Sequence, residues 1–109
     1  MESTGKPISF DRMLDALGDV QRRKLLIALL EHNPQDDRPA VIAGSDTEDD
    51  VADRLLDMRH NHLPKLTAYG LIEWDRGAHE VLKGRNFDEV EPLLELLKAH
   101  EEELVADWL

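Results

Sequence analysis

An amphipathic helix followed by a glycine and a β-hairpin is the feature of this sequence that most constrains its fold. The apolar face of the helix comes from residues spaced three and four apart, Leu55, Met58, His62 and Leu66. This spacing predicts a helix over about 51–68, which Gly70 then ends. Apolar and polar residues alternate over about 71–83 on both sides of Asp75-Arg76-Gly77-Ala78, which predicts a hairpin. In this hairpin we expect Ile72 and Trp74 to lie opposite Val81.

Pro64 lies inside the helical pattern and predicts an irregularity there. Proline has no backbone N–H and its ring collides with the preceding turn, so it removes one hydrogen bond and bends a helix. The residues leave two outcomes open: one kinked helix, or two helices that meet near Pro64.

Two helices are predicted before this segment. Ser9 can cap a short first helix that Gly18 ends, and its apolar residues are Phe10, Met13, Leu14 and Leu17. Asp19 can cap a second, strongly apolar helix that stops before Asn33-Pro34. We expect this second helix to be the centre of the core.

Residues 33–47 combine prolines, a glycine and acidic side chains, and they predict a loop. Within it, Ala40–Ala43 is either a short strand, since Val41 and Ile42 are β-branched, or part of the loop. Thr47 is suited to cap the helix that follows, because acidic residues come directly after it.

The last apolar pattern predicts a helix over about 88–107, with Pro92 tolerated in its first turn. Its apolar residues could cover the core of one subunit, but they form more surface than a terminal helix of so small a chain easily hides. We therefore expect residues 86–109 to form a dimerisation helix in a homodimer. Its interface residues would be Leu93, Leu94, Leu97, Leu104 and Trp108.

The 109 residues suffice for one domain and contain no cysteine, which excludes disulfides and thiolate metal sites. No apolar run approaches the roughly 18 residues of a membrane span, and the start lacks signal-peptide features, so we expect a cytoplasmic protein without a membrane partner. No serine has a nucleophile-elbow setting and no phosphate-binding loop occurs, so we expect no enzyme activity. His60 and His62 would point roughly 200° apart on a helix and do not chelate one metal together. No metal site, cofactor or small-molecule ligand is predicted.

The net charge of −11 is concentrated at the end of the chain, where residues 86–109 carry −7. A folded protein with this composition is typical of a salt-adapted cytoplasm. In molar salt the Debye length is about 3 Å, so the total charge does not decide whether the chain binds a polyanion. Nine of the thirteen lysines and arginines form three groups: Arg22-Arg23-Lys24, then Arg54, Arg59 and Lys65, then Arg76, Lys83 and Arg85.

Nearly the whole chain resembles small haloarchaeal winged-helix proteins described as ArsR-like or as transcription regulators with a domain of unknown function. The most specific matches are HLPKL at 62–66, GLIEWD at 70–75, and LDAL followed by basic residues and an apolar helix at 14–30. The resemblance implies a tail at 1–8, a mostly helical winged helix-turn-helix domain with a small β-hairpin at 9–85, and the dimerisation helix.

The resemblance also implies a homodimeric transcription regulator that binds double-stranded DNA through a recognition helix at about 51–68 and a wing at about 71–83. The residues that match DNA-contacting positions are Arg22, Arg23, Arg54, His60, Asn61, Lys65, Arg76 and His79.

The acidic loop at 33–47 departs from the family pattern, which places a positioning helix directly before the recognition helix. Either residues 47–56 supply a short positioning helix, or one long helix serves both purposes. The alternative function is a degenerate winged helix that binds another protein and no DNA.

Overall fold

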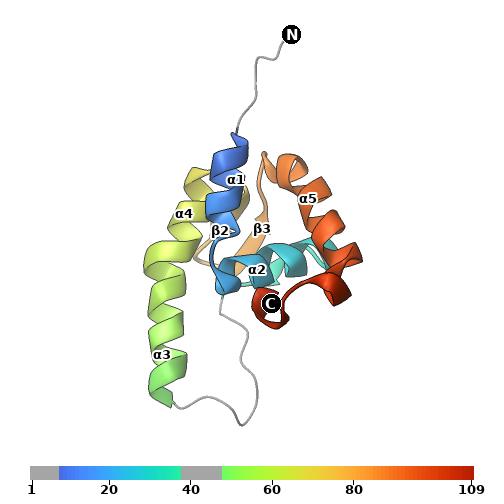
Figure 1. Cartoon of the computed structure of the whole chain (residues 1–109). Helices are drawn as coiled ribbons and strands as arrows, with labels where there is room; N and C mark the ends of the chain where they lie inside the picture. The colour runs from blue at the N-terminus through green and yellow to red at the C-terminus, as the bar shows by residue number, and fades with distance from the viewer. Residues whose placement is uncertain (1–7, 38–47) are drawn as a thin grey trace.

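The computed structural model describes residues 8–37 and 48–109, and shows a mostly helical chain with a small antiparallel sheet (Figure 1). The elements are α1 (Phe10–Ala16), α2 (Val20–Glu31), β1 (Gln35–Asp36), α3 (Glu48–Asp57), the π-helical segment η1 (Met58–His62), α4 (Leu63–Ala68), β2 (Ile72–Asp75), β3 (Glu80–Lys83), α5 (Phe87–Ala99) and the short 3₁₀ helices η2 (Glu101–Glu103) and η3 (Ala106–Trp108). Within these described ranges, no helix has the length and apolarity that crossing a bilayer requires.

The first two helices begin at the capping residues that the sequence predicted. The Ser9 hydroxyl accepts a hydrogen bond from the Arg12 N–H at 3.2 Å, and the Asp19 carboxylate accepts from the Gln21 N–H at 2.8 Å. Each cap satisfies a backbone donor that a helix start leaves free. The apolar pattern of α1 is divided, however, because Phe10 and Leu14 are exposed.

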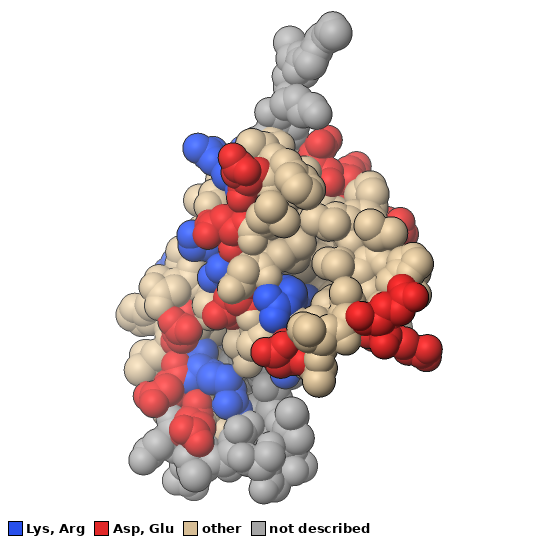
Figure 2. All heavy atoms as spheres, in the orientation of Figure 1, with Lys and Arg blue, Asp and Glu red and all other residues tan. Residues whose placement is uncertain are grey.

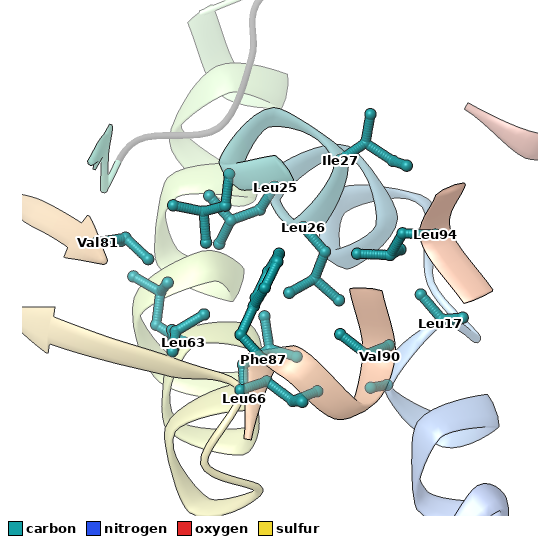
Figure 3. Packing of buried hydrophobic residues seen from close by; sticks show 14 of the residues in the cluster. Leu17, Leu25, Leu26, Ile27, Leu63, Leu66, Val81, Phe87, Val90 and Leu94 are labelled. Atoms are coloured by element: carbon teal, nitrogen blue, oxygen red, sulfur yellow. The ribbon is translucent and has the colours of Figure 1, made fainter. Parts of the chain in front are cut away.

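The core lies where α2, α4, α5 and the sheet meet. Figure 3 shows the Phe87 ring among side chains of α2 and α4. The large apolar side chains of the core with less than 2% exposure are Phe87, Leu26, Leu29, Leu63, Leu66, Leu71, Ile72, Leu94, Val81 and Val90. Burial of each contributes about 1.5–3 kcal/mol, so the packed helices hold the hairpin in place. The prediction that the second helix is central to the core is confirmed.

The segment from Glu48 to Ala68 forms one continuous helical run, and no turn separates two helices. The Leu63 N–H bonds to the Met58 carbonyl oxygen, five residues back, which widens the helix over η1. Because Pro64 has no N–H and its ring needs room, the wider turn just before it accommodates the ring. Of the two outcomes left open, one irregular helix is correct, and α3 extends away from the rest of the fold (Figure 1).

The sheet has the order β1-β3-β2, so a strand from before the long helix joins the hairpin. This strand is Gln35–Asp36, whereas the expected Ala40–Ala43 strand and the Thr47 cap lie outside the described residues. Trp74 lies opposite Val81 as predicted, but Ile72 lies opposite Lys83. Ile72 and Val81 are both buried, because their side chains share the inner face of the sheet.

Gly70 ends the long helix in the left-handed conformation, with φ of 75°. A Cβ at this position would lie 2.5 Å from Asn86 Nδ2. The Asn86 side chain needs this space, because it donates to the Tyr69 carbonyl at 2.9 Å and thereby ties the helix end to the start of α5. The sequence prediction of a glycine stop is confirmed.

The last helix is shorter than predicted, since α5 ends at Ala99 and not near residue 107. Three consecutive glutamates, Glu101–Glu103, follow at the negative end of the helix dipole, where acidic side chains are unfavourable. The chain then turns back, and Trp108 and Leu109 pack against the core. The expected dimerisation helix over 86–109 is therefore a 13-residue helix followed by a returning tail.

Candidate nucleic-acid interface

Arg22, predicted as a DNA contact, is instead part of the interior, with 8% exposure. Its guanidinium donates to the Ala16 and Asp15 carbonyls at the end of α1, at 2.8 Å each. Its Nη1 lies 3.0 Å from His62 Nδ1. Arginine only donates, so His62 Nδ1 accepts and Nε2 carries the proton, 3.0 Å from Asp57 Oδ2. Arg22 therefore joins α1 to the long helix and is not available to DNA.

Arg23 also has a structural position. It donates to the Leu17 carbonyl at 2.6 Å and to the Trp108 carbonyl at 2.5 Å. These bonds fasten the returning tail to the junction between α1 and α2. Its prediction as a DNA contact is corrected for the same reason as that of Arg22: backbone carbonyls already occupy the guanidinium.

Lys65 is held by α1 through an ion pair with Asp15 at 2.7 Å. The Tyr69 hydroxyl donates to the same carboxylate oxygen at 2.5 Å. The hydrogen bond from Lys65 and then that from Tyr69 lower the pKa of Asp15, and the bond to Asp15 raises the pKa of Lys65. Lys65 therefore lies on the side of α4 that faces α1.

Arg54, His60 and Asn61 lie on the outer side of α3 and η1. They line a shallow depression of about 580 Å³, whose lining is Asp53, Arg54, Leu56, Asp57, His60 and Asn61. The Asn61 amide donates to the Asp57 carboxylate, and this bond is the main reason that the pKa of Asp57 is lowered. His60 and Asn61 are exposed, as the predicted polar face requires.

The β2–β3 hairpin carries Arg76 at its turn, with the guanidinium 4.2 Å from the centre of the Trp74 ring. The Trp74 indole N–H donates to Asp37 Oδ2 at 3.2 Å, and His79 Nδ1 lies 3.4 Å from the same oxygen. Asp37 is 1% exposed and follows β1 directly. Asp37 thus fixes the Trp74 indole, and the indole in turn holds the Arg76 guanidinium over the hairpin. His79 contacts the same carboxylate of Asp37.

A groove lies between the long helix and the β2–β3 hairpin. One part of it has a volume of about 400 Å³ and is lined by Asp37, Arg59, His60, Pro64, Trp74 and Arg76. The next part, about 370 Å³, is lined by Pro64, Thr67, Ala68, Trp74 and Arg76. Three shared residues join the two parts, and we call the whole the helix–wing groove, after the wing that the sequence predicts at this hairpin. It brings together two predicted contacts, His60 and Arg76.

Arg59 is a groove residue that the sequence prediction omitted from the contacts. The signal that could have identified it is the second helical stripe, His60, Pro64 and Ala68, whose members are four residues apart and line the groove beside the hairpin. Arg59 adjoins this stripe at the turn nearest Asp37. The stripe of His60, Pro64 and Ala68 is hard to recognise in the sequence, because the same helix carries a more regular apolar stripe on its inner side.

Acidic side chains are prominent on the view in Figure 2, around the C-terminal tail and beside α3. Lysine and arginine side chains lie mainly between these two regions, over α1, α2 and the long helix. Acidic and basic side chains thus lie beside one another on this face of the molecule.

The predicted dimer residues are divided between core and surface. Leu94 is completely buried inside the subunit, while Leu93, Leu97 and Trp108 are half-buried and pack against the core, and Leu104 is half-buried. Leu94 is therefore corrected to a core residue. The apolar side chains that remain exposed in this region are Leu96 and Val105, at 57% and 72%.

Within residues 8–37 and 48–109, no group of three or more histidine, aspartate or glutamate side chains has the arrangement of a metal site. His62 is a packed core histidine that contacts Arg22, as its place on the apolar face predicted.

Comparisons with protein-family models, with characterised proteins and with solved structures find no significant match to this chain.

Proposed function

We propose that this chain is a winged-helix transcription regulator that binds double-stranded DNA as a homodimer, with the helix–wing groove and the outer side of the long helix as its contact surface. The observation that carries the proposal is the groove itself, in which Arg59 and His60 of the helix face Arg76 of the hairpin. The order of a projecting helix, a glycine stop and a braced hairpin supports it.

The dimensions of the long helix suit the proposal. An α-helix with its side chains is about 10–12 Å wide, and the major groove of B-DNA is about 12 Å wide. His60 and Asn61 are exposed on the outer side of this helix, and asparagine can pair with the adenine edge. Arg59 and Arg76 are suited to bind the phosphates on either side of the DNA major groove.

The acidity of the chain is compatible with this function in concentrated salt. Where the Debye length is about 3 Å, only charges almost in contact with a phosphate contribute. The acidic tail and the outer end of α3 then affect DNA little, and local hydrogen bonds and shape dominate the binding.

DNA binding can be tested by fluorescence anisotropy with labelled genomic fragments over a range of KCl concentrations. We expect Arg59→Ala and Arg76→Ala each to weaken binding and to reduce the log–log salt slope by about 1.8, because each substitution removes one phosphate contact from both subunits of the dimer. Lys98→Ala is the matched control, because Lys98 lies on α5, pairs with Glu31 at the end of α2, and does not line the helix–wing groove. Absence of binding by the folded wild type at every salt concentration would contradict the function and favour the protein-interaction alternative.

The homodimer is supported by exposed apolar side chains on α1, α5 and the tail: Phe10, Leu14, Leu96 and Val105. Leu96→Asp is the appropriate test, because Leu97 packs against the core and an aspartate there would also disturb folding. Light scattering should show twice the monomer mass for the wild type and half that value for Leu96→Asp. Leu56→Asp, equally exposed but on α3, is the control and should stay dimeric. A monomeric wild type would refute the dimer.

A further inference from the structure

The side-chain amide of Asn61, on the outer side of the long helix, has its orientation set by Asp57, one turn earlier. The lowered pKa of Asp57 keeps its carboxylate ionised, so both oxygens accept hydrogen bonds and neither donates. The Asn61 amide contacts Oδ1 of this carboxylate, so its nitrogen, and not its oxygen, faces Asp57. This bond uses one of the two amide N–H groups. The amide oxygen and the second N–H are left for a ligand, because Asn61 is exposed and lines the depression on this side of the helix.

The other oxygen of Asp57 is engaged from inside the fold. Asp57 Oδ2 lies 3.0 Å from His62 Nε2, which carries the proton because Nδ1 accepts from Arg22. The contact is electrostatic and not a well-aligned hydrogen bond, and Asp19 Oδ1 lies 3.4 Å from the same nitrogen. His62 is 4% exposed, and two backbone carbonyls fix Arg22, so the ring keeps this N–H towards Asp57. The Asp57 carboxylate therefore lies between a fixed donor on its inner side and the Asn61 amide on its outer side.

We propose that Asp57 is a positioning residue that gives Asn61 a preference for adenine over guanine. This assignment rests on the proposed function, since Asn61 reads a base only when the long helix enters the major groove. With its nitrogen turned to Asp57, Asn61 presents an acceptor and a donor outward. The edge of adenine offers the N6 donor and the N7 acceptor, which match this pair, whereas guanine offers two acceptors, N7 and O6. Guanine O6 would face the Asn61 oxygen, and two acceptors repel each other.

The substitution Asp57→Asn tests this arrangement, because it keeps the shape of the side chain and leaves one acceptor in place of two. The new amide turns its oxygen to the fixed N–H of His62, so its nitrogen faces Asn61. Asn61 then turns over, accepts from that nitrogen with its own oxygen, and presents its two N–H groups outward. Two donors match N7 and O6 of guanine. The base preference is therefore expected to reverse, which a purely structural role of Asp57 would not produce.

The experiment selects binding sites for the full chain from random-sequence duplexes at one high KCl concentration, and then measures affinities by fluorescence anisotropy. The adenine that Asn61 contacts is the one whose replacement by 7-deazaadenine, which lacks the N7 acceptor, weakens the wild type but not Asn61→Ala. Replacement of this adenine by guanine in one half-site should weaken the wild type by about tenfold or more and should tighten binding by Asp57→Asn. The ratio of the two affinities cancels the loss of one negative charge, which acts on both duplexes alike.

Asp88→Asn is the matched control, because it makes the same charge change on an exposed residue of α5 and should keep the wild-type preference. The proposal is overturned by an adenine dependence that survives in Asn61→Ala, by an adenine preference that persists in Asp57→Asn, or by a wild type that binds DNA without base preference. A wild type that binds no DNA at any salt concentration overturns the proposed function as well, so the two failures are distinguishable.

Circular dichroism checks the folding of each variant. If Asp57→Asn does not fold, nitrogen NMR spectroscopy of the wild type provides a second measurement, which needs neither DNA nor a substitution. The His62 ring should carry its proton on Nε2, with Nδ1 unprotonated. A proton on Nδ1 would remove the fixed arrangement between Arg22, His62 and Asp57 and would refute the positioning role.

Discussion

Replacement of Arg22 by methionine separates a structural arginine from a DNA-binding one. The change removes three hydrogen bonds, to the carbonyls of Asp15 and Ala16 and to the His62 ring, and among the described residues only the Asp15 carbonyl keeps another donor, the Gly18 N–H. A net hydrogen bond is worth about 1 kcal/mol, and more when the donor is charged. Methionine keeps the apolar contacts of the arginine stem, so the expected loss is about 3 kcal/mol.

This loss is large for a domain whose total free energy of unfolding is about 5–15 kcal/mol. Thermal unfolding followed by circular dichroism at constant KCl should show a midpoint about 10–20 °C below that of the wild type. Arg12→Met is the control, since Arg12 is exposed and its guanidinium lies 6.0 Å from the Tyr69 ring centre; it should change the stability by less than about 0.5 kcal/mol. Equal effects of the two substitutions would refute the structural role of Arg22.

Three further predictions concern the helix end, the core and the dependence on pH. Gly70→Ala should lower the free energy of unfolding by about 2 kcal/mol or more, measured by chemical denaturation, because alanine resists a φ of 75° and its Cβ would overlap Asn86. Gly77→Ala is the control and should lower it little, because its Cβ would lie 3.6 Å from Asp75 Oδ1. Leu94→Ala should lose about 2–5 kcal/mol, as a fully buried leucine does, and Leu96→Ala under about 1 kcal/mol; similar values would contradict the assignment of Leu94 to the core. Because the pKa of Asp15 is lowered in the folded state, its ionised carboxylate stabilises the fold at pH values above the ordinary pKa of 3.8, and this stabilisation disappears as the pH falls through the folded pKa. NMR titration should therefore find the Asp15 pKa below 3.8 in the wild type and closer to 3.8 in Tyr69→Phe. An unshifted pKa in the wild type would contradict the contact between Asp15 and its two partners.

Local signals that act within a few residues were predictable from the sequence. Ser9 and Asp19 cap helices because their side chains reach the next free N–H groups, and Gly70 ends a helix because it tolerates positive φ. The hairpin register around Trp74 and Val81 follows from alternation and turn length. These features depend on neighbours in the chain, so the sequence contains nearly all the information.

Features that depend on distant contacts were not predictable in the same way. The apolar spacing of the last residues continues to predict a helix, but the tail instead turns back, because Arg23 donates to the Trp108 carbonyl and Trp108 and Leu109 pack against the core. The effect of Pro64 was foreseen only as a bend, because a widened turn over Met58–His62 depends on where the helix packs on both sides. Asp37 was not predicted at all, since its importance arises from Trp74 and His79, which lie far along the chain.

The corrected set of cations has a quantitative consequence for DNA binding. Because Arg22, Arg23 and Lys65 are occupied by the fold, Arg59 and Arg76 remain as the groove arginines of each subunit. A dimer that neutralises four phosphates has a log–log salt slope of about −4, whereas five phosphate contacts in each subunit would give about −9. Over a tenfold rise in salt, the smaller set loses about 10⁴ in affinity and the larger set about 10⁹. A surface with few phosphate contacts is therefore the kind of interface that keeps binding DNA in concentrated salt, which is consistent with the acidic composition of the chain.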